Sequence, residues 1–183
     1  MTTYVIFKYL HILFAIGWLG GGFCMVLLGV AASRARNDAE LVRVMGQMAW
    51  LAKRVFVPFS GLALLCGLVM TWLGGMWGEA WIILGLIGYA ATAGTGMAVL
   101  GPKSEKVAAI AAKEGPSGPA VRIAREMLAV ARFDITMLAV VVADMVLKPA
   151  FDDYEMLVPM VVVLVAAAAY FLMPLRSAQP ARA

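Results

Sequence analysis

Long apolar runs separated by short charged segments dominate the chain. A bilayer core of about 30 Å requires roughly 20 apolar residues in a helix, and five runs are long enough. They cover residues 4–32, 55–77, 80–101, 127–147 and 156–175. The pattern therefore predicts an all-α integral membrane protein. We expect a single transmembrane domain over residues 1–183, built as a bundle of five transmembrane helices.

The two longer connections, residues 33–54 and 102–126, are also patterned as helices. In the first, apolar residues recur every three or four positions, which is typical of an interfacial helix, and Asn37 or Asp38 can cap its start. We expect it to run directly into the second span. The second connection opens at Gly101-Pro102 and breaks again over residues 115–119. These breakers predict a separate helical hairpin beneath the membrane.

The basic residues are distributed unevenly between the two sides of the predicted membrane. Of the 15 basic residues, all except Lys8 and Lys148 lie in the connections 33–54 and 102–126, at the entrance of the fourth span, or in the C-terminal tail. Lys and Arg are retained on the cytoplasmic side, so we predict an outside N-terminus and a cytoplasmic C-terminus. The first run is read as a retained span, since it lacks a basic segment before it. We expect a multi-pass protein of the bacterial inner membrane.

The composition agrees with a lipid environment and excludes other classes. Apolar residues make up 63% of the chain and charged residues 14%, whereas soluble domains average about 45–50% and 25%. Disordered chains are poor in apolar residues, so disorder is excluded as well. The net charge of +4 follows from topology, which leaves no argument for nucleic acid. The expected partner is the lipid bilayer, and a homo-oligomer or a membrane-complex partner stays open.

The single histidine, His11, lies in the first span and shares a helical face with Trp18. One histidine excludes a bis-histidine haem within one chain and any multi-histidine metal site. Two interpretations of His11 stay open. It is either a functional intramembrane group, or a side chain that hydrogen-bonds a neighbouring helix or interfacial water.

Three acidic and basic residues interrupt the fourth span, so one side of it must face protein or water. Asp144 is predicted to lie near the depth of His11, and the two could meet, which would hold the imidazole in one tautomer. Alternatively, Asp144 pairs with Lys148 one helical turn later. Arg132 and Asp134, at the other end of the span, are expected to form a polar contact on the cytoplasmic side.

Methionine is frequent, with 13 residues, and the topology places Met70, Met145 and Met160 near the depth of His11. Thioethers bind Cu(I) because both partners are soft, so these residues with His11 are candidate copper ligands. The alternative is that the methionines fill gaps between helices. No nucleotide, hydrolase or zinc-protease motif is present in the sequence. We therefore predict that the protein is not a conventional enzyme.

Two segments carry a family resemblance: Lys8-Tyr9-Leu10-His11-Ile12-Leu13 followed by Trp18, and the run from Arg132 and Asp134 to Asp144-Met145-Val146-Leu147-Lys148-Pro149. They resemble a bacterial family of predicted integral membrane proteins of unassigned function. That family is similar to CopD-type copper-resistance membrane proteins and to HemJ-type protoporphyrinogen oxidases. The resemblance covers residues 4–150.

The resemblance implies roles for particular residues. His11 and Trp18 match the first-helix His and Trp of the HemJ-like pattern and would be cofactor-binding, while Arg132 and Lys148 match the ends of its last core helix. The third helix lacks the Lys and His of that pattern. CopD-like copper handling keeps His11 and the methionines as ligands, and an accessory membrane subunit fits the same pattern. A haem b oxidoreductase with His11 as an axial ligand and a structural protein without a cofactor are the alternatives.

Overall fold

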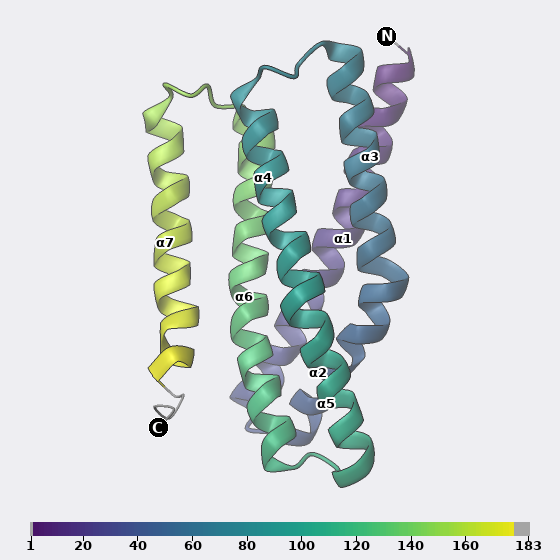
Figure 1. Cartoon of the computed structure of the whole chain (residues 1–183), viewed down its shortest axis with the longest axis vertical. Helices are drawn as coiled ribbons and strands as arrows, with labels where there is room; N and C mark the ends of the chain where they lie inside the picture. Colours follow the sequence, from purple (N-terminus) through teal and green to yellow (C-terminus); the bar gives the residue numbers. More distant parts are fainter. Residues whose placement is uncertain (1, 178–183) are drawn as a thin grey trace.

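The computed structural model describes residues 2–177, and every element in that range is helical. The elements are α1 (Thr2–Arg34), α2 (Asp38–Leu51), the π-helical turn η1 (Ala52–Phe56), α3 (Val57–Gly74), α4 (Ala80–Thr95), the π-helical turn η2 (Gly96–Leu100), α5 (Gly101–Glu114), α6 (Gly118–Leu147) and α7 (Tyr154–Ser177). Because α2, η1 and α3 are continuous, as are α4, η2 and α5, the described chain forms five long antiparallel helices (Figure 1).

Four of these helices are long and apolar enough to cross a membrane. They are Thr3–Arg34, Asp38–Gly74, Ala80–Glu114 and Tyr154–Leu175. The 30-residue α6 falls outside this group, because Arg132, Asp134 and Asp144 interrupt its apolar sequence. The predicted all-helical membrane bundle is thus confirmed.

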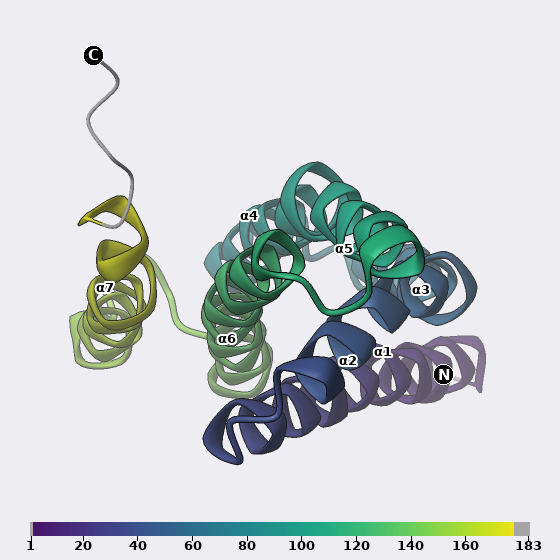
Figure 2. The ribbon, with the colours of Figure 1, turned by 90° about the horizontal axis from the view of Figure 1, so that it is seen from below.

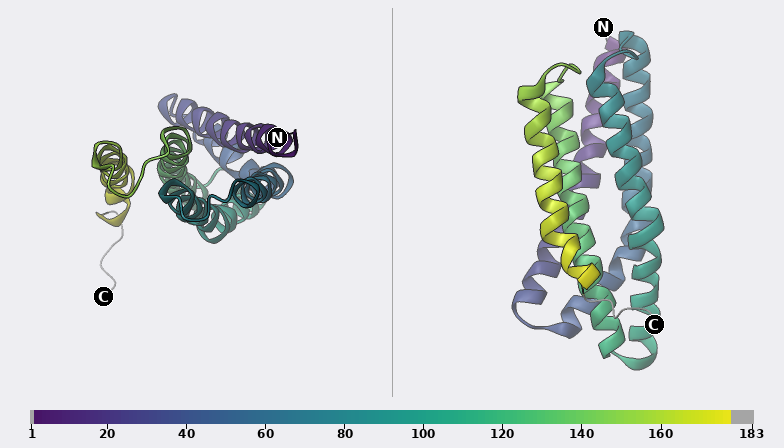
Figure 3. Two further views of the ribbon diagram at one scale, coloured as in Figure 1. Left: turned by 90° about the horizontal axis from the view of Figure 1, so that it is seen from above. Right: turned by 60° about the vertical axis from the view of Figure 1, so that its left-hand side comes forward.

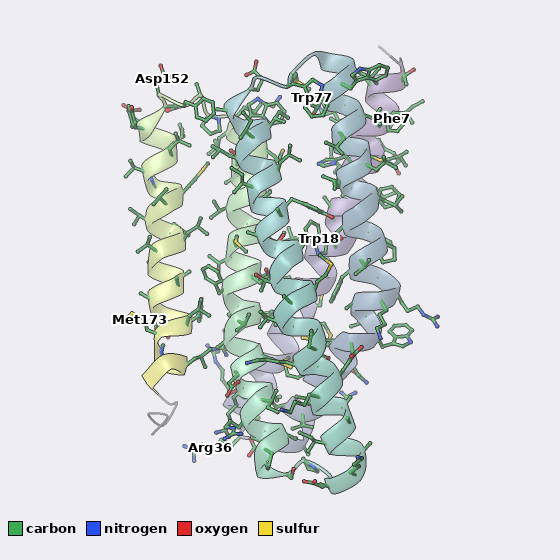
Figure 4. The ribbon with its side chains drawn as sticks, in the orientation of Figure 1. Phe7, Trp18, Arg36, Trp77, Asp152 and Met173 are labelled. Atoms are coloured by element: carbon green, nitrogen blue, oxygen red, sulfur yellow. The ribbon has the colours of Figure 1, made fainter. Side chains whose placement is uncertain are left out.

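The bundle has two chemically different ends. We call the end with the turns 75–79 and 148–153 the acidic end, since Glu79, Asp152 and Asp153 lie there. The opposite end, with the turns 35–37 and 115–117, is the basic end. Figure 4 shows Trp77 and Asp152 at the acidic end and Arg36 at the basic end.

The best-packed core lies in the half of the bundle nearer the basic end, where α2, α5 and the first half of α6 gather against α1 (Figure 2). Its fully buried side chains include Leu41, Met45, Val107 and Met127. The hydroxyl of the buried Ser104 donates to the Met45 carbonyl, 2.7 Å away. The long helices, of up to 37 residues, exceed the roughly 20 needed to cross a bilayer. The extra length builds this core.

The start of α2 matches its prediction. The Glu40 amide donates to the Asn37 side-chain oxygen at 3.0 Å, so Asn37 is the N-cap. The Arg43 guanidinium hydrogen-bonds Glu40 and holds the pKa of that carboxyl below its ordinary value. The helix continues through η1 into α3 without a break, as expected.

The predicted helix break at Gly101-Pro102 is wrong. The Gly101 amide donates to the Gly96 carbonyl, five residues earlier, so η2 is a widened turn. The widening lets the helix pass Pro102, which lacks an amide hydrogen and would crowd a regular turn. In the same way, Val57 donates to the Ala52 carbonyl immediately before Pro58. Residues 102–114 of the predicted connection therefore extend the third helix.

The last helix, α7, stands at the edge of the bundle and packs against α6 (Figure 3). A groove runs between them near the acidic end, lined by small and apolar residues such as Ala139, Ala143 and Pro159. Most of the α7 surface is exposed in the single chain. Lipid is the natural cover for such an apolar surface.

Candidate functional site

His11 is held between α1 and α3. Its Nδ1 lies 2.7 Å from the carbonyl oxygen of Ala63, and a carbonyl can only accept, so Nδ1 is the donor. The imidazole also packs against Gly67, where a Cβ atom would lie 3.2 Å from the ring. Glycine therefore leaves the space that the ring occupies. When the imidazole is neutral, the lone pair is then on Nε2, the arrangement found in metal-binding histidines.

The predicted thioether ligands lie in three different places. Met70 follows Gly67 by three residues on α3, which puts it on the side of α3 that meets α1. The methyl of Met145 covers Gly85, between α4 and α6. Met160 lines the groove between α6 and α7. Met70 therefore shares the face of α3 that carries Ala63 and Gly67, whereas Met145 and Met160 lie in other interfaces.

Trp18 links the first helix to α4. Its ring meets Tyr89 edge-on, with 5.6 Å between the centroids, and Figure 4 shows it about midway along the bundle. The neighbouring glycines of α1 are covered by aromatic rings, Phe59 over Gly17 and Phe56 over Gly21. Helix packing therefore fills the space at Gly17 and Gly21.

Asp144 is the most unusual buried polar group in the described chain. It is 4% exposed, and neither carboxyl oxygen has a hydrogen-bond partner. It packs against Gly85, where a Cβ would lie 3.4 Å from Oδ2. Buried polar groups are nearly always satisfied, and a charge left unpaired in a low-dielectric interior is costly. Such a group within a membrane bundle is a candidate functional position.

His11 and Asp144 lie near the same end of the bundle but in different interfaces. Gly67, beside His11, is two turns from the end of α3, and Gly85, beside Asp144, is less than two turns from the start of α4. The turn 75–79 joins those two helix ends. Among the described residues no hydrogen bond or ion pair joins His11 to Asp144.

The alternative pairing of Asp144 with Lys148 does not form either. Lys148 caps the end of α6 in the left-handed conformation, with φ of 51°. Its side chain therefore does not follow the helical direction that would bring it to Asp144 one turn earlier. Its ammonium instead lies over the Trp81 ring, 5.0 Å from the centroid. This cation–π contact fixes Lys148 at the acidic end.

The expected contact between Arg132 and Asp134 is also wrong. Residues two apart on a helix do not face each other. Arg132 lies one turn before Thr136, on the side of α6 that lines the α7 groove. Asp134 lies one turn before the buried Leu138, on a different side of α6. Both lie near the middle of the 30-residue α6, and Arg132 Nε and Asp134 Oδ1 are buried without a partner.

The described part of the chain holds no group of three or more His, Cys, Asp or Glu side chains placed to bind a metal ion. Sequence reasoning missed the Ala63 carbonyl and Gly67 beside His11, and Tyr89 beside Trp18. A glycine in the middle of an apolar helix was the one available signal, since it permits close approach of another side chain.

A helical bundle with several apolar helices of membrane length and a few buried ionisable groups is an integral membrane protein. The comparison with protein families agrees. The chain belongs to the family described as Predicted integral membrane protein (DUF2269), whose model matches residues 5–149. That range ends before α7 begins at Tyr154. No curated protein and no solved structure matches the chain.

Proposed function

We propose that the protein is a CopD-like copper-handling protein of the bacterial inner membrane, with His11 and Met70 as its first ligands. It binds or passes Cu(I), or serves as an accessory subunit whose membrane partner carries the chemistry. The observation behind this proposal is the 2.7 Å hydrogen bond from His11 Nδ1 to Ala63. When the imidazole is neutral, that bond leaves the Nε2 lone pair available to a metal, and Met70 follows Gly67, against which the ring packs, by three residues on α3.

The donor chemistry suits Cu(I) better than other metals. Imidazole nitrogen and thioether sulfur are soft or borderline ligands, which select Cu(I) over Mg²⁺, Ca²⁺ or Mn²⁺. Asp144 and Met145 lie less than two turns from the same end of the bundle, where they add a carboxyl group and a second thioether. Met160 lies in the groove between α6 and α7, away from the α1–α3 interface that holds His11. A substitution of Met160 therefore serves as the control for substitutions of the proposed copper ligands.

The proposal includes a topology of five spans with an outside N-terminus and a cytoplasmic C-terminus. The basic end is then cytoplasmic, in line with the retention of Lys and Arg on that side. His11 faces the outer half of the bundle, where copper would enter from outside. The odd number of spans requires α6 to cross the membrane with its charged groups turned toward neighbouring helices.

Metal analysis of the purified chain after growth in copper tests the proposal. We expect copper in the wild type, its loss in His11→Ala, a reduced content in Met70→Leu and full content in Met160→Leu. Full copper in His11→Ala contradicts the assignment. An absorption spectrum of the same sample tests the haem alternative, because bound haem gives a Soret band. The packed glycine face of α1 favours a spectrum without one.

A further inference from the structure

A pocket of about 470 Å³ opens at the basic end, between the start of α6 and the end of α7. Its lining includes two arginines one helical turn apart, Arg122 and Arg125, together with the apolar Val121 and Leu175. Figure 4 shows Arg36 at the same end of the bundle. The pocket therefore combines guanidinium groups with apolar walls.

The two acidic residues that line the pocket are already paired. Asp38 accepts from Arg125 at 2.8 Å, and Glu126 accepts from Lys103 at 2.7 Å. The first pair holds the Arg125 guanidinium in place. The side chain of Arg122, in contrast, is exposed and has no ion pair or hydrogen bond among the described residues. One guanidinium is thus free for a ligand.

The pocket also lies where the apolar surface of α7 ends. The membrane-length stretch Tyr154–Leu175 terminates at Leu175, which is itself part of the pocket wall. A ligand here would have its charged part on the arginines and its apolar part along α7. Soluble anions do not use the second feature, whereas a phospholipid uses both.

We propose that this pocket binds the phosphate of an anionic phospholipid. Guanidinium groups match phosphate oxygens through paired hydrogen bonds, and basic segments beside membrane helices attract the anionic lipids of the cytoplasmic leaflet. Arg122 is the main phosphate contact and Arg125 a second, positioned by Asp38. The inference is independent of copper, and it requires only that the basic end be at a membrane surface.

Native mass spectrometry of the full chain, titrated with phosphatidylglycerol or phosphatidylethanolamine, tests this site. We expect preferential retention of phosphatidylglycerol, and Arg122→Gln should weaken it about tenfold, the effect of losing one charge-assisted hydrogen bond. The matched control is Lys106→Gln, which removes an exposed cation of α5 that does not line the pocket. Unchanged retention in Arg122→Gln, or an equal loss in both variants, overturns the proposal.

Inorganic phosphate in the same titration separates a lipid site from a free-anion site. We expect millimolar phosphate to leave phosphatidylglycerol bound, because the ion cannot use Leu175 and Val121. Displacement of the lipid by phosphate at that concentration overturns the assignment to a lipid. Arg122 has no partner in the described chain, so Arg122→Gln should keep the thermal midpoint of the wild type.

Discussion

At the scale of single residues, glycine determines which side chains meet. Gly67 makes room for the imidazole of His11, and Gly85 makes room for Asp144 and Met145. In lipid, helices associate through close packing, so a missing Cβ decides the contact. A glycine within an apolar helix indicates a close helix contact, but the sequence could not show which side chain would fill each space.

Gly17 offers a test of this packing. An added Cβ would overlap the ring of Phe59, whereas nothing lies within 4 Å of a Cβ at Gly20. We expect Gly17→Ala to destabilise the bundle by about 1–3 kcal/mol through overpacking. Gly20→Ala should be neutral or stabilising by up to about 1 kcal/mol, because alanine favours a helix. Thermal unfolding in one detergent compares the two, and equal midpoints would contradict the packing described here.

The candidate site shows where sequence reasoning ends at this scale. The depth of His11 and Asp144 could be predicted from their distances to the span centres, and both do lie near one end. Their partners could not, because each residue advances a helix by about 100° and small rotations change the neighbour. His11 faces α3 and Asp144 faces α4 as a result.

At the scale of elements, the two π-helical turns each join two helical segments into one long helix. The turn η1 joins α2, near the basic end, to α3, and η2 joins α4 to α5, near the basic end. In each turn, the residue just before a proline donates its amide hydrogen to the carbonyl five residues earlier. A widened turn leaves no trace in hydropathy, and a proline is ordinarily a helix breaker. For that reason the sequence did not predict that α4 continues into α5. It did predict that α2 continues into α3, because no Gly-Pro pair lies between them.

Ser104 ties the two basic-end halves together. Its buried hydroxyl donates to Met45 at 2.7 Å and approaches the Gly46 carbonyl at 3.3 Å. We expect Ser104→Ala to cost about 1 kcal/mol, the net value of a typical hydrogen bond. The matched control Ser117→Ala alters a partly exposed serine whose hydroxyl lies 3.5 Å from Glu114, and it should change little. A thermal midpoint for Ser104→Ala equal to that of the control would show that this bond does not hold α2 to α5.

At the scale of the whole molecule, the family match ends at residue 149 and α7 follows it. The first six helices form the packed body, and α7 adds one face to α6. Composition and hydropathy were sufficient to predict this membrane bundle, because most of the apolar residues fall in five long runs. The side of the membrane on which each end lies remains a prediction from charge.

Paired reporters test that topology. We expect a fusion after Asp152 to place its reporter outside the cell membrane and a fusion after Ala183 to place it in the cytoplasm, because α7 crosses between them. Alkaline phosphatase and a fluorescent protein, active on opposite sides, read the result. Reporters on the same side at both positions would exclude a crossing by α7 and with it the five-span arrangement.

Copper-edge X-ray absorption of the reconstituted chain, loaded with Cu(I), tests the ligand assignment most directly, because it identifies the atoms bound to the metal. We expect nitrogen and sulfur scatterers in the wild type, with the nitrogen contribution lost in His11→Ala and the sulfur contribution reduced in Met70→Leu. A spectrum without sulfur, or one that His11→Ala leaves unchanged, would contradict a copper site at His11 and Met70.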